Sequence, residues 1–108
     1  MTKIERLKLY LTIIDKLKKY NQKDVFICNI IDRYQLLPQK WTIKKDLPEM
    51  FARYDESDLY KDEINWDPGD WGIKHFAWWY DDPTKTACNV RIRFLKKCIK
   101  DIDPKYKF

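Results

Sequence analysis

Glycine is scarce in this sequence: only two of the 108 residues are glycine, beside five prolines. Glycine supplies the left-handed backbone conformations that tight β-hairpins require, so a chain this poor in it cannot build many hairpins. The sequence also lacks the glycine-rich loop that cradles phosphates in dinucleotide-binding and P-loop proteins. This scarcity favours helices and excludes the common nucleotide-binding motifs.

Long apolar runs are missing as well. No stretch approaches the ~20 apolar residues that a membrane-spanning helix needs. The first residues, Met1 to Arg6, alternate charged with apolar side chains, whereas a secretory signal needs an unbroken apolar segment. We therefore expect a protein that is neither exported nor held in a membrane and that works in the cytoplasm.

Histidine and cysteine, the residues that most often hold transition metals or act as base and nucleophile, are few. His75 is the only histidine, and no serine or cysteine stands in a recognisable nucleophile motif. The cysteines are odd in number, and each lies among apolar residues at helical spacing, which indicates buried structural thiols, not a zinc site or a disulfide framework. They are Cys28, Cys88 and Cys98. The sequence therefore predicts no metal, no cofactor, no small-molecule substrate and no catalytic residue.

Charge is abundant but unevenly distributed, with a formal net charge of +5. Residues 1–54 carry a net +6, residues 55–72 a net −6 and residues 73–108 a net +5. The acidic stretch offers paired carboxylates of the kind used in hydrolysis, but a single loop has no second element to hold their geometry, so a solvated face is favoured. Such a chain can meet nucleic acid with its ends and a basic protein with its middle.

Capping signals and apolar spacing predict a single, mainly α-helical domain over residues 1–108, with about four helices. Thr2 and Glu5 form a capping-box sequence that opens a first helix ending near Asn21. Asp24 is predicted to cap a second helix that runs to about Tyr34.

The later part of the chain is predicted to hold a short helix, a long loop and a long helix. Residues 41–45 are predicted to be connecting chain, and Asp46 to cap a short helix with Pro48 in its first turn. Residues 55–70 are predicted to form the long acidic loop, because they lack a clear period and end in a strong turn signal. Asp82-Pro83 is expected to start the last helix, which runs to about Ile102.

The last helix has a cation within its apolar face. Arg91 has apolar neighbours three, four, seven and eight residues away, so we expect it to be buried. Because a buried guanidinium must be hydrogen-bonded, we expect an internal acidic partner or backbone carbonyls for it. The opposite face carries Lys85, Arg93, Lys96, Lys97 and Lys100.

Two surfaces are candidates for binding a partner. Residues 66–80 are dense in aromatics, which are common interface anchors. Because a small helical domain also needs large apolar side chains in its core, we expect Trp78 or Trp79 to be buried and Trp66 or Trp71 to be more exposed. The basic face of the last helix suits nucleic acid. The predicted partner-binding residues are Tyr60, Trp66, Asp70 and Trp71 in the acidic aromatic segment and Arg93, Lys96, Lys97 and Lys100 on the last helix.

The segments Phe26-Ile27-Cys28 and Phe94 to Ile99, together with Arg91, resemble small helical proteins encoded by phages and other mobile elements. In size and style the chain is similar to anti-CRISPR inhibitors directed against type VI RNA-guided RNA nucleases. That resemblance implies a non-enzymatic inhibitor or modulator that binds a host nuclease or its RNA complex and blocks productive assembly. The alternative is a small RNA- or DNA-binding accessory protein that uses its basic helix faces.

Overall fold

The computed structural model describes residues 1–53 and 83–108 of the chain. These two stretches contain five α-helices and a short 3-10 helix and no strand, which confirms the predicted mainly α fold. Two predictions fall on residues 54–82 and so lie outside the described residues. They are the long acidic loop, and the burial of Trp78 or Trp79 with greater exposure of Trp66 or Trp71. The elements are α1 (Lys3–Lys18), the 3-10 helix η1 (Gln22–Asp24), α2 (Ile27–Arg33), α3 (Ile43–Asp46), α4 (Pro48–Arg53) and α7 (Lys85–Ile102).

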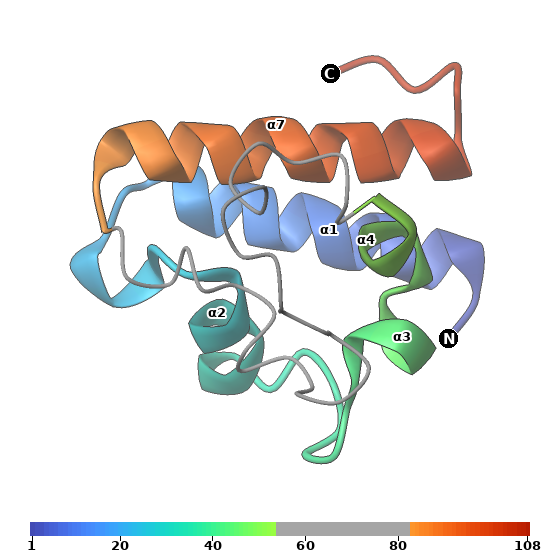
Figure 1. Cartoon of the computed structure of the whole chain (residues 1–108), viewed down its shortest axis with the longest axis horizontal. Helices are drawn as coiled ribbons and strands as arrows, with labels where there is room; N and C mark the ends of the chain where they lie inside the picture. Colours follow the sequence, from blue (N-terminus) through green and yellow to red (C-terminus); the bar gives the residue numbers. More distant parts are fainter. Residues whose placement is uncertain (54–82) are drawn as a thin grey trace, which may run out of the picture.

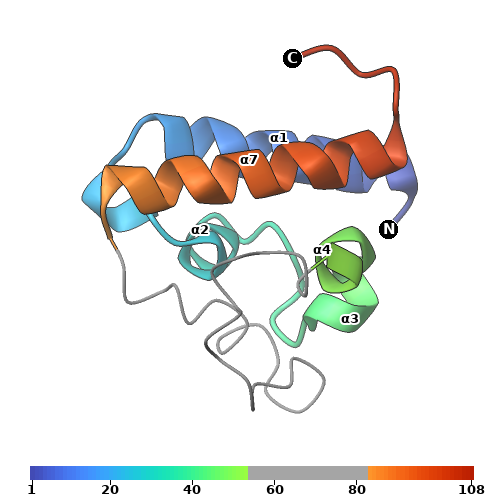
Figure 2. The same cartoon turned by 45° about the horizontal axis from the view of Figure 1, so that its top comes forward.

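The two long helices, α1 and α7, lie side by side and run in opposite directions (Figure 1). The shorter helices α2, α3 and α4 lie together on one side of this pair, as the tilted view shows (Figure 2). Of these, α2 packs on α1 and α4 packs on α7. The described part of the chain is therefore a helix pair with a layer of short helices against it.

The start of α1 matches the predicted capping box. The Thr2 backbone N–H donates to Glu5 Oε1 at 2.9 Å, and the Glu5 N–H donates to Thr2 Oγ1 at 3.1 Å. The hydrogen bond from the Thr2 backbone N–H to the Glu5 carboxylate favours its ionised form and lowers the pKa of Glu5. After Lys18 the chain turns at Tyr20, which has a φ of 49°, so the helix ends close to the predicted stop.

The start of α2 differs from the prediction. Phe26 occupies the N-cap position, and its side chain makes no capping hydrogen bond. Asp24 lies instead in the 3-10 helix, 3% exposed, where its carboxylate accepts from Arg33 Nη1 at 2.8 Å and from the Tyr34 hydroxyl at 2.7 Å. These two donors come from the far end of α2, so the carboxylate fixes the end of the helix and not its beginning.

The predicted connecting chain at residues 41–45 is wrong in part, because Ile43–Asp46 forms α3. Thr42 is its N-cap and accepts from the Lys45 N–H at 3.3 Å. Asp46 does not cap the next helix; its carboxylate accepts from the Thr42 N–H at 2.9 Å and so closes α3 on itself. The following helix, α4, begins at Pro48 as predicted, where the missing N–H costs no hydrogen bond.

The last helix, α7, begins slightly later than predicted and ends where expected. Thr84, and not the Asp82-Pro83 pair, is its N-cap, because Thr84 Oγ1 accepts from the Ala87 N–H at 3.2 Å. The helix ends at Ile102, two residues before Pro104. Its inward face buries Ala87, Cys88, Arg91, Ile92, Phe94, Leu95, Cys98 and Ile99.

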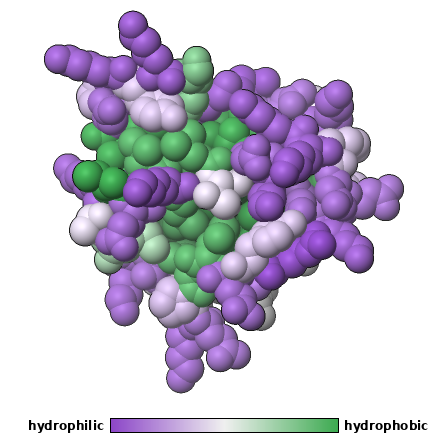
Figure 3. Space-filling model, turned by 180° about the vertical axis from the view of Figure 1, so that it is seen from behind, coloured by the Kyte–Doolittle hydropathy of each residue, from purple (hydrophilic) through white to green (hydrophobic). Residues whose placement is uncertain are grey.

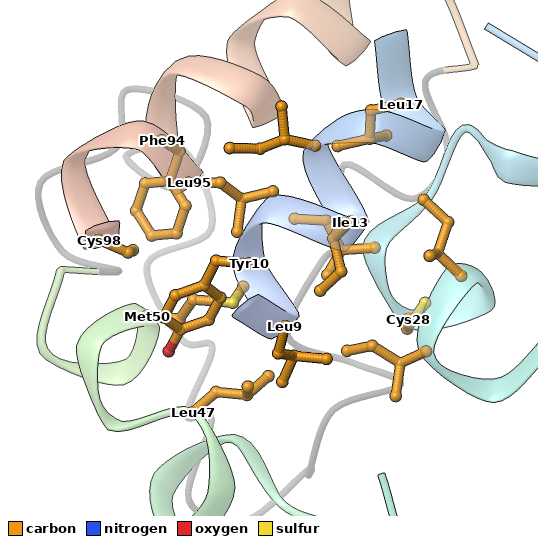
Figure 4. Close-up of a cluster of buried hydrophobic side chains, with 14 of the residues drawn as sticks. Leu9, Tyr10, Ile13, Leu17, Cys28, Leu47, Met50, Phe94, Leu95 and Cys98 are labelled. Carbon is orange, nitrogen blue, oxygen red and sulfur yellow. The ribbon is translucent and has the colours of Figure 1, made fainter. Parts of the chain in front are cut away.

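The core lies between the helix pair and the short helices (Figure 4). Ile13 and Leu17 of α1, Leu95 of α7 and Met50 of α4 are buried in it. The hydroxyl of Tyr10 points from α1 toward α4. The core is largely aliphatic among the described residues, with side chains that interdigitate from several helices.

Arg91 is a charged residue within this core, at 0% exposure. Its Nη1 donates to the Val25 carbonyl at 2.7 Å, and its guanidinium lies 5.0 Å from the centre of the Phe26 ring. The Cys88 thiol lies 3.7 Å from the same carbonyl. The predicted burial is confirmed, and a backbone carbonyl is one of the two kinds of partner that were expected.

We expect Arg91→Ala to destabilise the fold by about 3 kcal/mol, because it removes a charge-assisted hydrogen bond and leaves a cavity in the core. Arg93→Ala is the matched control: it removes the same side chain from the exposed face of α7 and should change stability by less than about 0.5 kcal/mol. Urea unfolding followed by circular dichroism measures both. Equal effects of the two substitutions would show that the burial of Arg91 contributes nothing.

Candidate nucleic-acid interface

The outward face of α7 is basic along its length. Lys85, Arg93, Lys97 and Lys100 are exposed, and Lys96 is half-buried. From Lys85 to Lys100 the helix contains no acidic residue. Since the helix repeats every 3.6 residues, these side chains share about a third of its circumference, opposite the buried face. The result is a continuous cationic surface on one rigid element.

The acidic residue of α7, Asp101, lies near its C-terminal end and forms an ion pair with Arg53 of α4. Arg53 Nη2 donates to Asp101 Oδ1 at 2.7 Å, and Arg53 Nε donates to the other carboxylate oxygen. This pairing uses the one carboxylate of the helix internally. It also fixes the position of α7 relative to the layer of short helices.

A second ion pair holds the other side of α4 against α1. Arg6 donates through Nε and Nη2 to Glu49 at 2.9 to 3.1 Å, and the Tyr10 hydroxyl donates to Glu49 Oε1 at 2.8 Å. The hydrogen bond to Glu49 raises the pKa of Arg6. Burial, with the nearby Glu49 carboxylate, raises the pKa of Tyr10. Arg6, Tyr10 and Glu49 satisfy one another's hydrogen-bonding groups, so these side chains support the fold.

The chain after α7 turns and runs back along the helix (Figures 1 and 2). Lys100 Nζ donates to the Tyr106 carbonyl and lies 3.4 Å from the Pro104 carbonyl. The Nζ atoms of Lys96 and Lys100 lie 5.2 and 5.9 Å from the centre of the Phe108 ring. Part of the basic face is therefore in contact with this C-terminal segment, residues 103–108.

Four of the eight predicted partner-binding residues lie in the part of the chain that the structure describes. Arg93, Lys97 and Lys100 lie together on the exposed face of α7, with Lys96 half-buried beside them. Neither Arg93 nor Lys97 forms an ion pair in the described ranges. The other four predicted residues, Tyr60, Trp66, Asp70 and Trp71, lie outside the described residues. The C-terminal aromatics were missed by the sequence analysis, because they follow Pro104 and belong to no periodic pattern.

Positive charge dominates the described stretches as a whole. Residues 1–53 and 83–108 contain 20 lysines and arginines against eight aspartates and glutamates, a net of +12. Of the eight acidic residues, four are paired with arginine or lysine side chains: Asp15, Asp24, Glu49 and Asp101. With residues 54–82 included, the chain carries a net +5, and a positive surplus attracts polyanions over a distance set by the salt concentration.

An apolar area also reaches the surface, on the face seen from behind (Figure 3). Ile4 of α1 is 68% exposed, and Leu7 and Leu11 are half-buried. At spacings of three and four residues these side chains form one stripe along the helix. Hydrophilic side chains surround the apolar area in the same view.

The three cysteines are buried, as predicted, and none is in a disulfide. Burial raises the pKa of the Cys28 thiol from 9.0 to about 11 and also raises the pKa of Cys98. Thiols that stay protonated are poor nucleophiles and poor metal ligands. In the two described stretches, no three histidine, cysteine or acidic side chains come together as a metal-binding group.

Within the same stretches, no helix combines the length and the apolar character needed to cross a bilayer. Comparisons with models of protein families, with curated proteins and with solved structures found no match to this chain.

The raised pKa of Cys28 predicts a loss of stability in alkali. In the unfolded chain the thiol ionises above pH 9, whereas in the folded protein it stays protonated to about pH 11. The thiol therefore contributes fully to the free energy of unfolding below pH 9, and this contribution falls as the pH rises from 9 to 11. By pH 11 the loss should reach about 2 kcal/mol. Unfolding free energies measured in urea from pH 7 to pH 11 should therefore fall more steeply for the wild type than for Cys28→Ala. Parallel curves would contradict this assignment.

Proposed function

We propose that this protein is a non-enzymatic modulator that binds a nucleic-acid-processing nuclease in its RNA-bound form, with the exposed face of α7 on the RNA. The observation that carries the proposal is the acid-free basic surface from Lys85 to Lys100 on a helix that is held rigidly by its buried face. We further propose that it acts in the cytoplasm and prevents productive assembly of its target.

Electrostatics supports the nucleic-acid side of this proposal. Lysines and arginines that neutralise phosphates release condensed counterions, which supplies most of the sequence-independent binding free energy. Arg93 and Lys97 are four residues apart, so they are neighbours on the helix surface and can contact one phosphate backbone together. The net charge of +5 on the whole chain adds long-range attraction.

The composition of residues 54–82 supports the protein side. This segment contains nine acidic residues and two lysines, together with all the tryptophans except Trp41. An acidic sequence rich in aromatics is chemically suited to the basic groove of a nucleic-acid-binding protein. The resemblance to anti-CRISPR inhibitors points to the same class of partner.

A second candidate function is direct RNA or DNA binding as an accessory protein. The basic face of α7 favours it, because that face needs no protein component in order to attract nucleic acid. The two functions differ in whether a nuclease is required for tight binding.

The two candidates are separated by affinity capture. We expect the tagged protein to retain one large nuclease from a bacterial lysate, and to retain it after digestion of the lysate with added ribonuclease and deoxyribonuclease. The reason is that a protein interface anchored by aromatics survives loss of exposed nucleic acid. Capture of mixed nucleic acid, with no protein left after digestion, would instead establish the accessory function.

The role of the α7 face is tested by its salt dependence. Arg93→Ala combined with Lys97→Ala should weaken RNA binding about tenfold and make the slope of log Kd against log salt shallower by about 1.5. Lys8→Ala combined with Lys45→Ala is the matched control, since it removes two exposed lysines from α1 and α3. Fluorescence anisotropy at several salt concentrations across a roughly sixfold range, from about 50 to about 300 mM, measures both slopes. Equal effects of the two pairs would show that net charge alone, and not this face, attracts RNA.

A further inference from the structure

Phe108 is an aromatic ring that is open to solvent. It is 56% exposed, although two lysines and a tyrosine contact it. The Tyr106 ring meets it edge-on at 5.0 Å with an interplanar angle of 66°. Tyr106 is half-buried and packs against the core, so it anchors the segment that carries Phe108.

The lysines that hold the Phe108 ring belong to the basic face of α7. Lys96 and Lys100 are one turn apart, and both ammonium groups lie within 6 Å of the ring centre, at 5.2 and 5.9 Å. Arg93 and Lys97 lie in the neighbouring row of the same face. The structure thus places an open aromatic surface on Lys96 and Lys100. The next row of the same helix face carries two exposed cations that form no ion pair in the described ranges.

This combination is the one used by proteins that bind single-stranded nucleic acid. Such sites join a positively charged track for the backbone to aromatic rings on which bases stack. A ring that served only to anchor the C-terminal segment would bury its surface, as Tyr106 does, and would need no cations beside it. The exposure of Phe108 favours contact with a ligand.

We propose that Phe108, Arg93 and Lys97 form a binding site for single-stranded nucleic acid, in which a base stacks on Phe108 and the two cations contact the adjoining phosphates. Lys96 and Lys100 are positioning residues that hold the ring at the edge of the basic face. This inference rests on the nucleic-acid contact in the proposed function and specifies its strandedness. A duplex keeps its bases stacked on one another, so it can offer phosphates to this site but no base face to Phe108.

The experiment measures binding of the full chain to a labelled 12-nucleotide single-stranded RNA, to a single-stranded DNA of the same sequence and to the matching RNA duplex. Phe108→Ala should weaken binding to the single strands about tenfold, within the range measured for loss of one stacked base, and leave duplex binding within about twofold. Phe108→Trp should keep single-strand affinity at or above that of the wild type. Ile4→Ala, which truncates an exposed apolar side chain on α1, is the matched control and should change neither.

Three results would overturn the proposal. Tighter binding of Phe108→Ala to all three ligands would mean that the C-terminal segment merely covers Lys96 and Lys100. The wild type could bind single strand and duplex with equal affinity, and Phe108→Ala could leave both affinities unchanged. The basic face would then be a phosphate-binding surface without a stacking site. Failure of the wild type to bind any of the three would remove the direct RNA contact in the proposed function as well, so the two failures are distinguishable.

Discussion

Burial of the Arg91 guanidinium constrains how α7 can pack. Desolvating a charge costs several kcal/mol unless the protein supplies hydrogen bonds in return. The Val25 carbonyl, 2.7 Å from Nη1, and the Phe26 ring can supply that environment only when the chain between η1 and α2 lies against this turn of α7. One buried cation thereby sets the register of the last helix against a segment more than 60 residues earlier. It also determines which face of α7 points outward.

The segment that receives Arg91 is itself held in place by polar contacts. Asp24 accepts hydrogen bonds from Arg33 and Tyr34, so the turn before α2 is bound to the end of that helix. On the other side of the molecule, α4 is joined to α1 through Glu49 and to α7 through Arg53. Helices of six and seven residues are too short to be stable alone. These side-chain contacts, added to the apolar core, give the short helices fixed positions and keep the basic face of α7 on a rigid support.

Local signals predicted much of the fold. The capping box at Thr2, the proline at the start of α4, the length of α7 and the burial of Arg91 all follow from residues close in sequence. The errors concern Asp24 and Asp46, which were interpreted as N-caps because aspartate is a good cap. Asp24 instead meets donors nine and ten residues away, and Asp46 closes the helix that it ends. A carboxylate accepts hydrogen bonds from whichever donors the folded chain brings to it, and spacing alone does not reveal them.

The helical class, the basic outward face of α7 and the cation on its inward face follow from local sequence, because each depends on a 3.6-residue period that neighbouring residues express. Three other features depend on tertiary packing: the carbonyl that receives Arg91, the carboxylates used in internal ion pairs, and the path of the chain after Ile102. Phe108 shows the difference most clearly. Nothing in the sequence places that ring beside Lys96 and Lys100, since the turn at Pro104 and the packing of Tyr106 against the core bring it back along α7. Contacts between residues on separate elements depend on the path of the folded chain, and the spacing of neighbouring residues does not predict that path.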